Sequence, residues 1–374
     1  MRILVLGEQT AGDRRVALTP ESVETLVAEG HEVIVESGAG AGIGAADDDY
    51  QSAGAGIAAR TDLLAAGGLV VGIDPLAGQG DDRLGPNHVV VGLLDPVWRP
   101  IRATELAATG ATGLSLDLIP RTTRAQAVDV LSSMATVAGF QAVLLAAQRL
   151  PKIFPLLITA AGTVPPAKVL VLGAGVAGLQ AVATARRLGA VVEGFDIRPE
   201  ALEQIRSLGG RSIEPPLGAD GGAPDAVRIH EALTPHVADS DVVVATAQIP
   251  GRRSPLLVTA DMVATMRPGS LVVDLAIERG GNCEVAQADA IVEHQGVSVL
   301  APTNLASGSA LTASRMFATN LVNLIRILDR DGEAHVDPAD DVLAGMLVVD
   351  RGEVVHPAVR EAIAQSSFST GELS

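Results

Sequence analysis

The amino-acid sequence predicts an α/β protein with two doubly wound, parallel-sheet, Rossmann-like domains joined by two long helices. Short strands rich in Val, Leu and Ile alternate with helical patterns along the chain. Its 374 residues are too many for one ordinary α/β core, which favours two domains. Aromatic residues make up only 2% of the chain, so packing depends on aliphatic side chains, as in parallel sheets covered on both faces.

The first domain is expected over residues 1–130 and 328–374. Its first helix is marked by Thr19 as N-cap, Pro20 at the first helical position and Gly30 just past the end. Residues 335–341 are typical of a polar loop, LAGMLVVDRGEVV of a hairpin, and the tail QSSFSTGELS of a frayed end. The expected strands are 2–6, 32–36, 69–73, 88–94 and 112–118.

The second domain is expected over residues 131–327, together with the connecting helices. The two long helical patterns run from about 124 to 149 and from 312 to 330, which suits segments that leave the first domain and return to it. The expected strands are 168–173, 190–196, 241–247, 270–276 and 297–302.

Charge and composition narrow the possible partners. The net charge of −17 disfavours nucleic acid and anionic lipid surfaces, although it also serves ordinary solubility. Cys283 is the only cysteine, so no intrachain disulfide can form and a reducing compartment fits. The most apolar region, 142–162, is interrupted by charged residues and prolines, and the N-terminus reads directly as a strand. We therefore expect a soluble chain without membrane insertion.

A glycine motif predicts a dinucleotide site in the second domain. Gly173, Gly175 and Gly178 form G-x-G-x-x-G directly after the strand KVLVL and before a helical pattern. Asp196 ends the next strand, where an acid can accept a hydrogen bond from a ribose 2′-hydroxyl and repel a 2′-phosphate. This favours NAD over NADP, although the nearby Arg198 could accommodate the phosphate.

The stretch IPRTTRAQAVDVLSS, residues 119–133, gathers many polar groups at the head of an apolar helix. Locally, Thr123 and Gln126 fit a capping box, and Asp129 could stabilise the first helical turn. Helical spacing would place Gln126, Asp129 and Ser133 on one stripe. By spacing alone, a structural role and a binding role both remain open.

The sequence offers little acid–base machinery. Its histidines show no metal-binding spacing, and we expect no metal site. Lys152 and Lys168 are the only lysines, and neither lies in the first domain. Cys283 follows a strand end without a His-paired nucleophile pattern.

Several segments, in order, carry a resemblance to a known family. Together they resemble the NAD(H)-binding component, domain I, of proton-translocating NAD(P) transhydrogenase, over essentially the whole chain. The wider superfamily includes alanine dehydrogenase, which shares RVALTP at 15–20 and the glycine loop. The segments are ESGAG (36–40), RAQAVDVLSS (124–133), TAAGTVPPAKVLVLGAGVAGLQA (159–181), FDIRPE (195–200), IPG (249–251), VVDLAIERGGNCE (272–284) and NLVNL (320–324).

The resemblance implies that hydride passes directly between NAD(H) on this chain and NADP(H) on a separate component, while a membrane-spanning subunit couples the transfer to proton movement. Such a chain would form a homodimer and lie on the cytoplasmic side, peripheral to the membrane through its partners. Alignment of two nicotinamide rings requires positioning groups rather than proton exchange, which fits the scarcity of catalytic His and Lys. Implied at the nicotinamide end are Arg121, Gln126, Asp129 and Ser132. The other implied cofactor contacts are Thr122, Thr123, Arg124, Gly173, Gly175, Val176, Ala177, Gly178, Asp196, Ile197, Arg198, Gly222, Ala247, Pro250 and Asn282.

Two alternatives remain at this point. An alanine-dehydrogenase-like enzyme would act on pyruvate, ammonia and NADH, and that family uses a first-domain lysine and histidine to hold and protonate the keto acid. The first domain has no lysine, and His31 and His88 lie outside the matching segments. A non-catalytic NAD-binding sensor is the other alternative.

Overall fold

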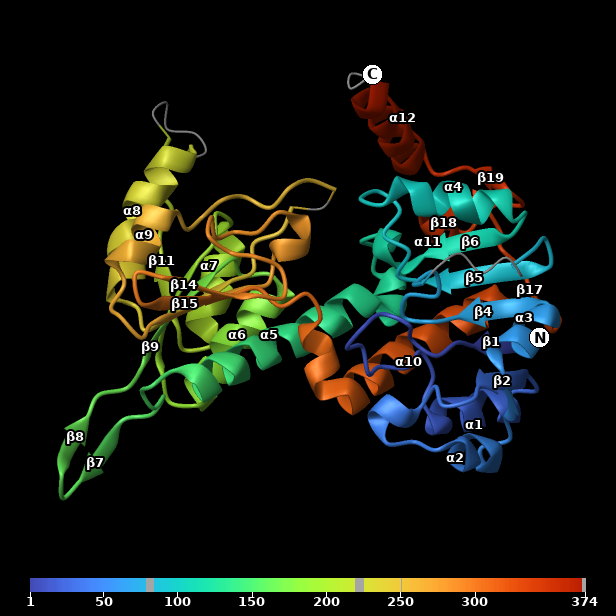
Figure 1. The fold of residues 1–374 in the computed structure, drawn as a ribbon, viewed down its shortest axis with the longest axis horizontal. Coiled ribbons are helices and arrows are strands. Elements are labelled where there is room, and N and C mark those ends of the chain that lie inside the picture. Colours follow the sequence, from blue (N-terminus) through green and yellow to red (C-terminus); the bar gives the residue numbers. More distant parts are fainter. Residues whose placement is uncertain (79–83, 219–224, 250, 372–374) are drawn as a thin grey trace. The chain divides into compact units, whose positions relative to one another are not determined.

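The computed structural model describes residues 1–78, 84–218, 225–249 and 251–371, and the chain divides into two compact units (Figure 1). Unit 1 comprises Met1–Met134 and Ser307–Ser374, and unit 2 comprises Ala135–Ala306. The sequence prediction instead put the return to the first domain at residue 328. The boundary differs because helix α10 (Ala310–Leu328) packs against helix α1 (Pro20–Ala28) of unit 1.

Unit 1 contains an eight-stranded sheet in the order β19-β18-β6-β5-β4-β1-β2-β3. Strands β1 to β6 are parallel, and their spatial order 3-2-1-4-5-6 is that of a doubly wound sheet. The predicted C-terminal hairpin is β18–β19, which joins the sheet antiparallel to β6. The strands are β1 (Arg2–Val5), β2 (Glu32–Glu36), β3 (Gly56–Ala58), β4 (Gly68–Val71), β5 (His88–Gly92), β6 (Thr112–Ser115), β18 (Leu347–Asp350) and β19 (Glu353–Val354).

The helices of unit 1 follow the local sequence signals in part. Helix α1 begins as predicted, with Thr19 at the N-cap and Pro20 in the first turn, and Gly30 follows with φ +91°. The tail predicted as frayed instead belongs to α12 (Pro357–Gly371), where Ser366 Oγ donates to the Ala362 carbonyl one turn earlier. The other elements are η1 (Ala41–Ile43), α2 (Asp47–Ser52), α3 (Arg60–Ala65), α4 (Pro100–Ala108), η2 (Leu116–Leu118), η3 (Arg124–Val128), β16 (Asp329–Arg330), β17 (Glu333–Ala334) and α11 (Asp341–Met346).

Unit 2 contains a seven-stranded sheet in the order β11-β10-β9-β12-β13-β15-β14, parallel except for β14. From β11 to β15 the spatial order is again 3-2-1-4-5-6, so the prediction of two doubly wound domains is confirmed. Strands β11 and β14 and the hairpin β7–β8 were not predicted. The strands are β7 (Leu157–Thr159), β8 (Gly162–Val164), β9 (Lys168–Leu172), β10 (Val191–Phe195), β11 (Arg211–Ile213), β12 (Val242–Ala245), β13 (Leu271–Asp274), β14 (Ile291–His294) and β15 (Val297–Leu300).

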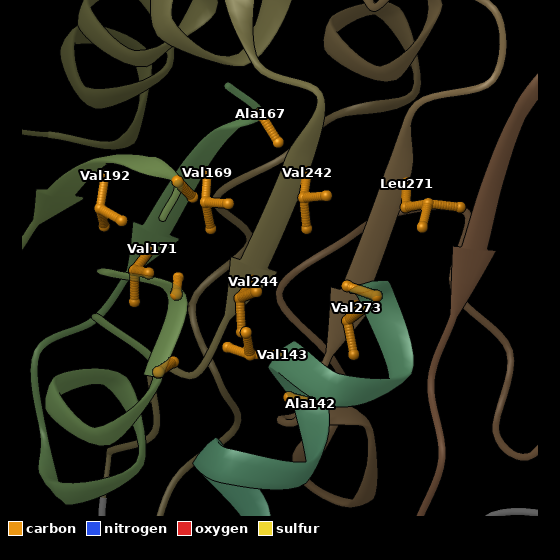
Figure 2. Close-up of a cluster of buried hydrophobic side chains, with 14 of the residues drawn as sticks. Ala142, Val143, Ala167, Val169, Val171, Val192, Val242, Val244, Leu271 and Val273 are labelled. Atoms are coloured by element: carbon orange, nitrogen blue, oxygen red, sulfur yellow. The ribbon is translucent and has the colours of Figure 1, made fainter. Parts of the chain in front are cut away.

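One face of the unit 2 sheet is covered by the end of helix α5 (Val130–Arg149). Figure 2 shows Ala142 and Val143 of this helix against the valines of the central strands. Among the described residues, α5 is the one helix long and apolar enough to cross a membrane. Core helices of globular proteins meet the same criterion, and Ala142 and Val143 are fully buried in the sheet core. The remaining elements are α6 (Val176–Arg187), α7 (Pro199–Ser207), α8 (Ala226–Asp239), α9 (Ala260–Thr265), η4 (Ile277–Arg279) and η5 (Leu305–Ser309).

Candidate functional site

The predicted glycine turn joins β9 to α6 at the carboxyl edge of the unit 2 sheet. β9 lies between β10 and β12, so the turn is at the point where the strand order reverses, the usual ligand position in such sheets. Gly173 has φ +90°, a conformation that glycine adopts readily. A Cβ added to Gly178 would lie 1.8 Å from the carbonyl oxygen of Gly173, so a larger residue cannot fit without displacing the backbone.

The middle glycine leaves the turn open to a ligand. Gly175 is exposed, and a Cβ built there has no heavy atom of the described residues within 4 Å. Gly175 is also the N-cap of α6, where no side chain caps the helix. The first-turn N–H groups and the helix dipole therefore favour an anion at this end. The space and the donors fit the pyrophosphate of a dinucleotide.

Asp196 ties the end of β10 to the glycine turn. Its Oδ2 accepts a hydrogen bond from the Ala174 N–H at 2.8 Å, and its Oδ1 accepts one from the Arg198 N–H at 3.0 Å. The Arg198 guanidinium donates through Nε to Oδ1 at 2.9 Å and through Nη2 to Oδ2 at 3.0 Å. Burial alone would raise the pKa of Asp196, but these hydrogen bonds outweigh burial and lower the pKa below its usual range. Asp196 is therefore a charged carboxylate.

The loop after β12 packs onto the turn through two polar residues. Thr246 Oγ1 donates to the Gly173 carbonyl at 2.9 Å. Asn282 accepts from the Ala247 N–H at 2.9 Å and donates through Nδ2 to the carbonyls of Ala247 at 2.9 Å and Pro255 at 2.8 Å. Asn282 is fully buried, so in this structure it positions Ala247 rather than presenting its own side chain at the surface.

A buried carboxyl group organises the Asn282 loop from below. Asp274 accepts hydrogen bonds from the N–H groups of Ala276 at 2.8 Å, Asn282 at 2.7 Å and Cys283 at 2.9 Å. Burial raises the pKa of Asp274 in spite of these three donors. Sequence reasoning missed Asp274 and Thr246. The available signal was a polar residue at the carboxyl end of a strand that neighbours the glycine turn in a doubly wound sheet.

The other residues expected near the cofactor differ in exposure. Val176 and Ile197 are exposed apolar side chains beside the turn and Asp196, and Ala177 is half-buried. Gly222 and Pro250 lie outside the described residues.

The polar segment 119–133 belongs to unit 1, and it is not one continuous helix as predicted. After η3, Asp129 adopts ψ 83° and α5 begins at Val130. The Asp129 carboxylate then caps α5: Oδ1 accepts from the Ser132 N–H at 2.9 Å and Oδ2 from the Ser132 hydroxyl at 2.6 Å. The structure thus brings together the two residues that the family resemblance paired.

The break makes the expected helical stripe wrong. Ser133 lies apart from Asp129 and donates to Asn320 Oδ1 on α10 at 2.6 Å. Asn320 and Asn323 also donate to the Ala127 carbonyl, at 2.9 and 3.1 Å. The two asparagines of the NLVNL motif therefore hold the polar segment in place.

Two side chains of this segment stand out as available. Arg121 and Gln126 are exposed, and no residue in the described part of the chain makes a hydrogen bond or ion pair with either side chain. The expected capping box is not formed, because the Thr123 side chain makes no cap hydrogen bond. Thr122 and Thr123 are also exposed. Arg124 instead pairs with Asp340 and Asp341 at the start of α11.

A separate polar pocket lies in unit 1, at the carboxyl ends of β1 and β2. It encloses about 250 Å³ and is lined in part by Glu8, Asp13 and Arg15. Arg15 pairs with Asp13 at 2.6 Å, and both are nearly buried. Burial raises the pKa of Glu8 to about 7, although the N–H groups of Ile73 and Asp74 donate to its carboxylate at 2.6 and 3.0 Å. The sequence carried no signal for this shifted acid beyond its nearness to RVALTP.

Histidine and lysine are committed to the fold. His88 is buried, accepts from the Gly85 N–H at 3.0 Å and lies 2.9 Å from the Leu64 carbonyl. Lys152 and Lys168 both pair with aspartates of unit 2. Within the residues that the structure describes, no group of three or more His, Cys, Asp or Glu could hold a metal ion.

Two family models match the chain. The N-terminal domain model of alanine dehydrogenase/PNT matches residues 4–138, and the C-terminal domain model matches residues 142–357. Between them they cover both units.

Individual relatives agree with these matches. The chain is 39% identical to an NAD(P) transhydrogenase alpha subunit of Rhodospirillum rubrum, over 96% of this chain and 99% of that one. The solved transhydrogenase of Sinorhizobium meliloti superposes with a TM-score of 0.89 at 39% identity, over 95% of this chain and all of that one. The alanine dehydrogenase of Halomonas elongata is 30% identical, over 97% of this chain and 96% of that one.

Proposed function

This chain belongs to the alanine dehydrogenase/PNT family, and we propose that it is the NAD(H)-binding alpha subunit of an NAD(P) transhydrogenase. It would exchange hydride with NADP(H) bound to a separate component. The observation that carries the proposal is the turn at Gly175, open to a ligand and followed by an uncapped helix N-terminus, in a chain that matches transhydrogenase alpha subunits along nearly their full length.

NAD(H) is the cofactor we assign to unit 2. The turn amides would bind the pyrophosphate, and the charged Asp196 would accept from the adenosine ribose. Exposed Val176 and Ile197 offer apolar surface beside them for the adenine. When bound, the nicotinamide supplies the hydride donor or acceptor, and the residues of the chain bind and orient it.

The nicotinamide end is assigned to the polar segment of unit 1. Arg121 and Gln126 have the free donors that a carboxamide or phosphate oxygen requires, since both side chains are exposed and make no hydrogen bond within the described residues. Asp129 and Ser132 are already joined at 2.6 Å, which gives a fixed polar pair at the start of α5. Fixed groups of this kind suit a transfer whose requirement is alignment of two rings.

The partners follow from the same proposal. An alpha subunit implies further transhydrogenase subunits, which we take to be an NADP(H)-binding component and a membrane-spanning component that couples the transfer to proton movement. The chain would then lie at the cytoplasmic face of the membrane, held there by its partners.

We also propose a homodimer in which the β7–β8 hairpin meets a second copy. The hairpin projects from the rest of unit 2 (Figure 1), and every residue of both strands is exposed, Ile158 by 77%. An isolated two-stranded hairpin is marginally stable in water, so an apolar hairpin of this kind requires a cover. Light scattering should give the mass of a dimer, and a monomer would contradict this aspect of the proposal.

The test of the function is a reconstitution. The purified chain is mixed with an NADP(H)-binding transhydrogenase component, NADPH and an NAD analogue whose reduced form has its own absorbance. Reduction of the analogue only when both proteins are present supports the proposal, and its absence under conditions where NADH binds would refute it.

The alternative is an alanine dehydrogenase, favoured by the match to the Halomonas elongata enzyme. Unit 1 has no lysine, and both ring nitrogens of the buried His88 contact backbone groups of the fold, so neither can hold and protonate a keto acid. Incubating the chain with alanine and NAD decides between the two. NADH formation at rates typical of an enzyme would favour the alternative.

A further inference from the structure

The acceptor positions of Asp196 are already filled. A carboxylate offers about four lone-pair positions, two on each oxygen. Two are taken by backbone N–H groups, those of Ala174 and Arg198, and these bonds shape the turn. The other two are taken by the Arg198 guanidinium, through Nε at 2.9 Å and Nη2 at 3.0 Å. With only 8% of Asp196 exposed, little of the carboxylate remains for an outside donor.

The guanidinium also lies over the turn itself. Arg198 Nη2 is 3.3 Å from the Ala174 carbonyl, the residue between the first two glycines of the motif. This is the edge of the turn where the acid of a dinucleotide fold receives the ribose hydroxyl. Arg198 is half exposed, at 51% of its side chain, so it can turn out into solvent without leaving a buried charge. Asp196 cannot move in the same way, because its backbone contacts tie it to the fold.

From these contacts we propose that Arg198 is an internal competitor for the ribose position. In the free chain its guanidinium occupies the Asp196 oxygens that the adenosine ribose needs, and it must turn outward when the cofactor binds. This inference rests on the proposed function, because it deepens the assignment of NAD(H) to unit 2.

The competition bears on cofactor choice. A cofactor with a 2′-hydroxyl displaces Arg198 and offers it no new partner, so NAD(H) binds against the loss of the ion pair. A 2′-phosphate offers the displaced guanidinium a charged partner, although it faces repulsion from Asp196. Arg198 therefore weakens NAD(H) binding and strengthens NADP(H) binding, which opposes the effect of Asp196.

The test compares Arg198→Met with wild type in calorimetric titrations of the full chain. The probes are ADP-ribose and 2′-phospho-ADP-ribose, which carry the adenosine end without nicotinamide. ADP-ribose should bind roughly two- to fivefold more tightly to the variant, the range expected from losing a half-exposed ion pair. The 2′-phosphorylated probe should bind roughly tenfold more weakly, because a charged hydrogen-bond partner is lost.

Two further variants keep the test specific. Arg206→Met is the matched control: Arg206 lies on the same helix, is 48% exposed and pairs with Glu214, away from the turn, so both affinities should stay at wild-type values. Arg198→Lys keeps the charge without the two-pronged geometry, and it should retain most of the affinity for the 2′-phosphorylated probe. Thermal unfolding of each variant verifies that it is folded.

The outcomes separate the possibilities. Equal weakening of both probes in Arg198→Met would overturn the inference, because Arg198 would then only support the turn. Weaker binding of ADP-ribose alone would also overturn it, since Arg198 would then contact NAD(H) directly. Failure of the wild-type chain to bind ADP-ribose, NADH or NAD would refute the proposed function itself, and the inference with it.

Discussion

Two glycines of the turn allow packing and ligand binding to be separated by single alanine substitutions. In Gly178→Ala the new Cβ would lie 1.8 Å from the Gly173 carbonyl oxygen and 2.9 Å from Thr246 Oγ1. Reaching even 3.0 Å from that oxygen requires a backbone movement of about 1.2 Å, the difference between 3.0 and 1.8 Å. Overpacking of this kind costs about 1–3 kcal/mol, or roughly 2–12 °C in the Tm of a unit of this size.

Gly175→Ala should act in the opposite way. The backbone there has φ −75° and ψ −169°, which alanine adopts, and the built Cβ has no heavy atom of the described residues within 4 Å. Stability should therefore stay the same or rise by up to about 1 kcal/mol through the unfolded state. The methyl group would instead occupy the space into which the pyrophosphate approaches, and NADH should bind roughly tenfold more weakly or worse.

Thermal unfolding by circular dichroism and NADH titration by fluorescence measure the two effects independently. A Tm for Gly178→Ala equal to that of wild type would show that the helix–turn contact is less tight than the structure indicates. Wild-type NADH affinity in Gly175→Ala would show that the pyrophosphate does not bind at this turn.

Asp196→Ala should relax discrimination against NADPH, measured as the ratio of NADPH and NADH dissociation constants, because the repelling carboxylate is gone and Arg198 is released; an unchanged ratio would contradict the role of this acid. Gln126→Asn and Arg121→Ala should each slow hydride exchange with the NADP-binding component far more than they weaken NADH binding, and equal losses in both would count against a positioning role. Glu8→Gln should remove a pH dependence of stability. The folded chain keeps a proton on Glu8 up to its pKa of about 7, while the unfolded chain loses it near the ordinary value of 4.5, so wild-type stability falls relative to the variant as pH rises between these values. At about 1.36 kcal/mol per pH unit the upper bound is about 3 kcal/mol, and urea unfolding at pH 5 and pH 8 that shows no such difference would refute the shifted pKa.

The sequence predicted those features that depend on local patterns. Aliphatic strands bounded by loops are visible without any knowledge of the fold, and the strands of both parallel sheets were found at nearly their observed positions. The glycine motif was equally clear, because the left-handed φ of Gly173 and the tight contact at Gly178 admit glycine and little else.

Features that depend on tertiary contacts were missed. The helix break at Asp129 arises from a side-chain cap that competes with helical continuation, and the propensities of neighbouring residues do not reveal it. Asn282 was expected at the cofactor, but a motif does not show which way a side chain points, and this one is buried beneath Ala247. The assignment of α10 to unit 1 likewise depends on contacts distant in sequence, such as Asn320 with Ala127.

The central claim is direct hydride transfer from one dinucleotide to another, and an isotope experiment tests it most directly. NADPH carrying deuterium at the transferring position of nicotinamide C4 is mixed with the NADP-binding component, this chain and NAD in ordinary water, and the NADH formed is analysed by mass spectrometry. We predict that the deuterium arrives in NADH undiluted. Deuterium lost to solvent, or NADH formed at the same rate without this chain, would contradict the account.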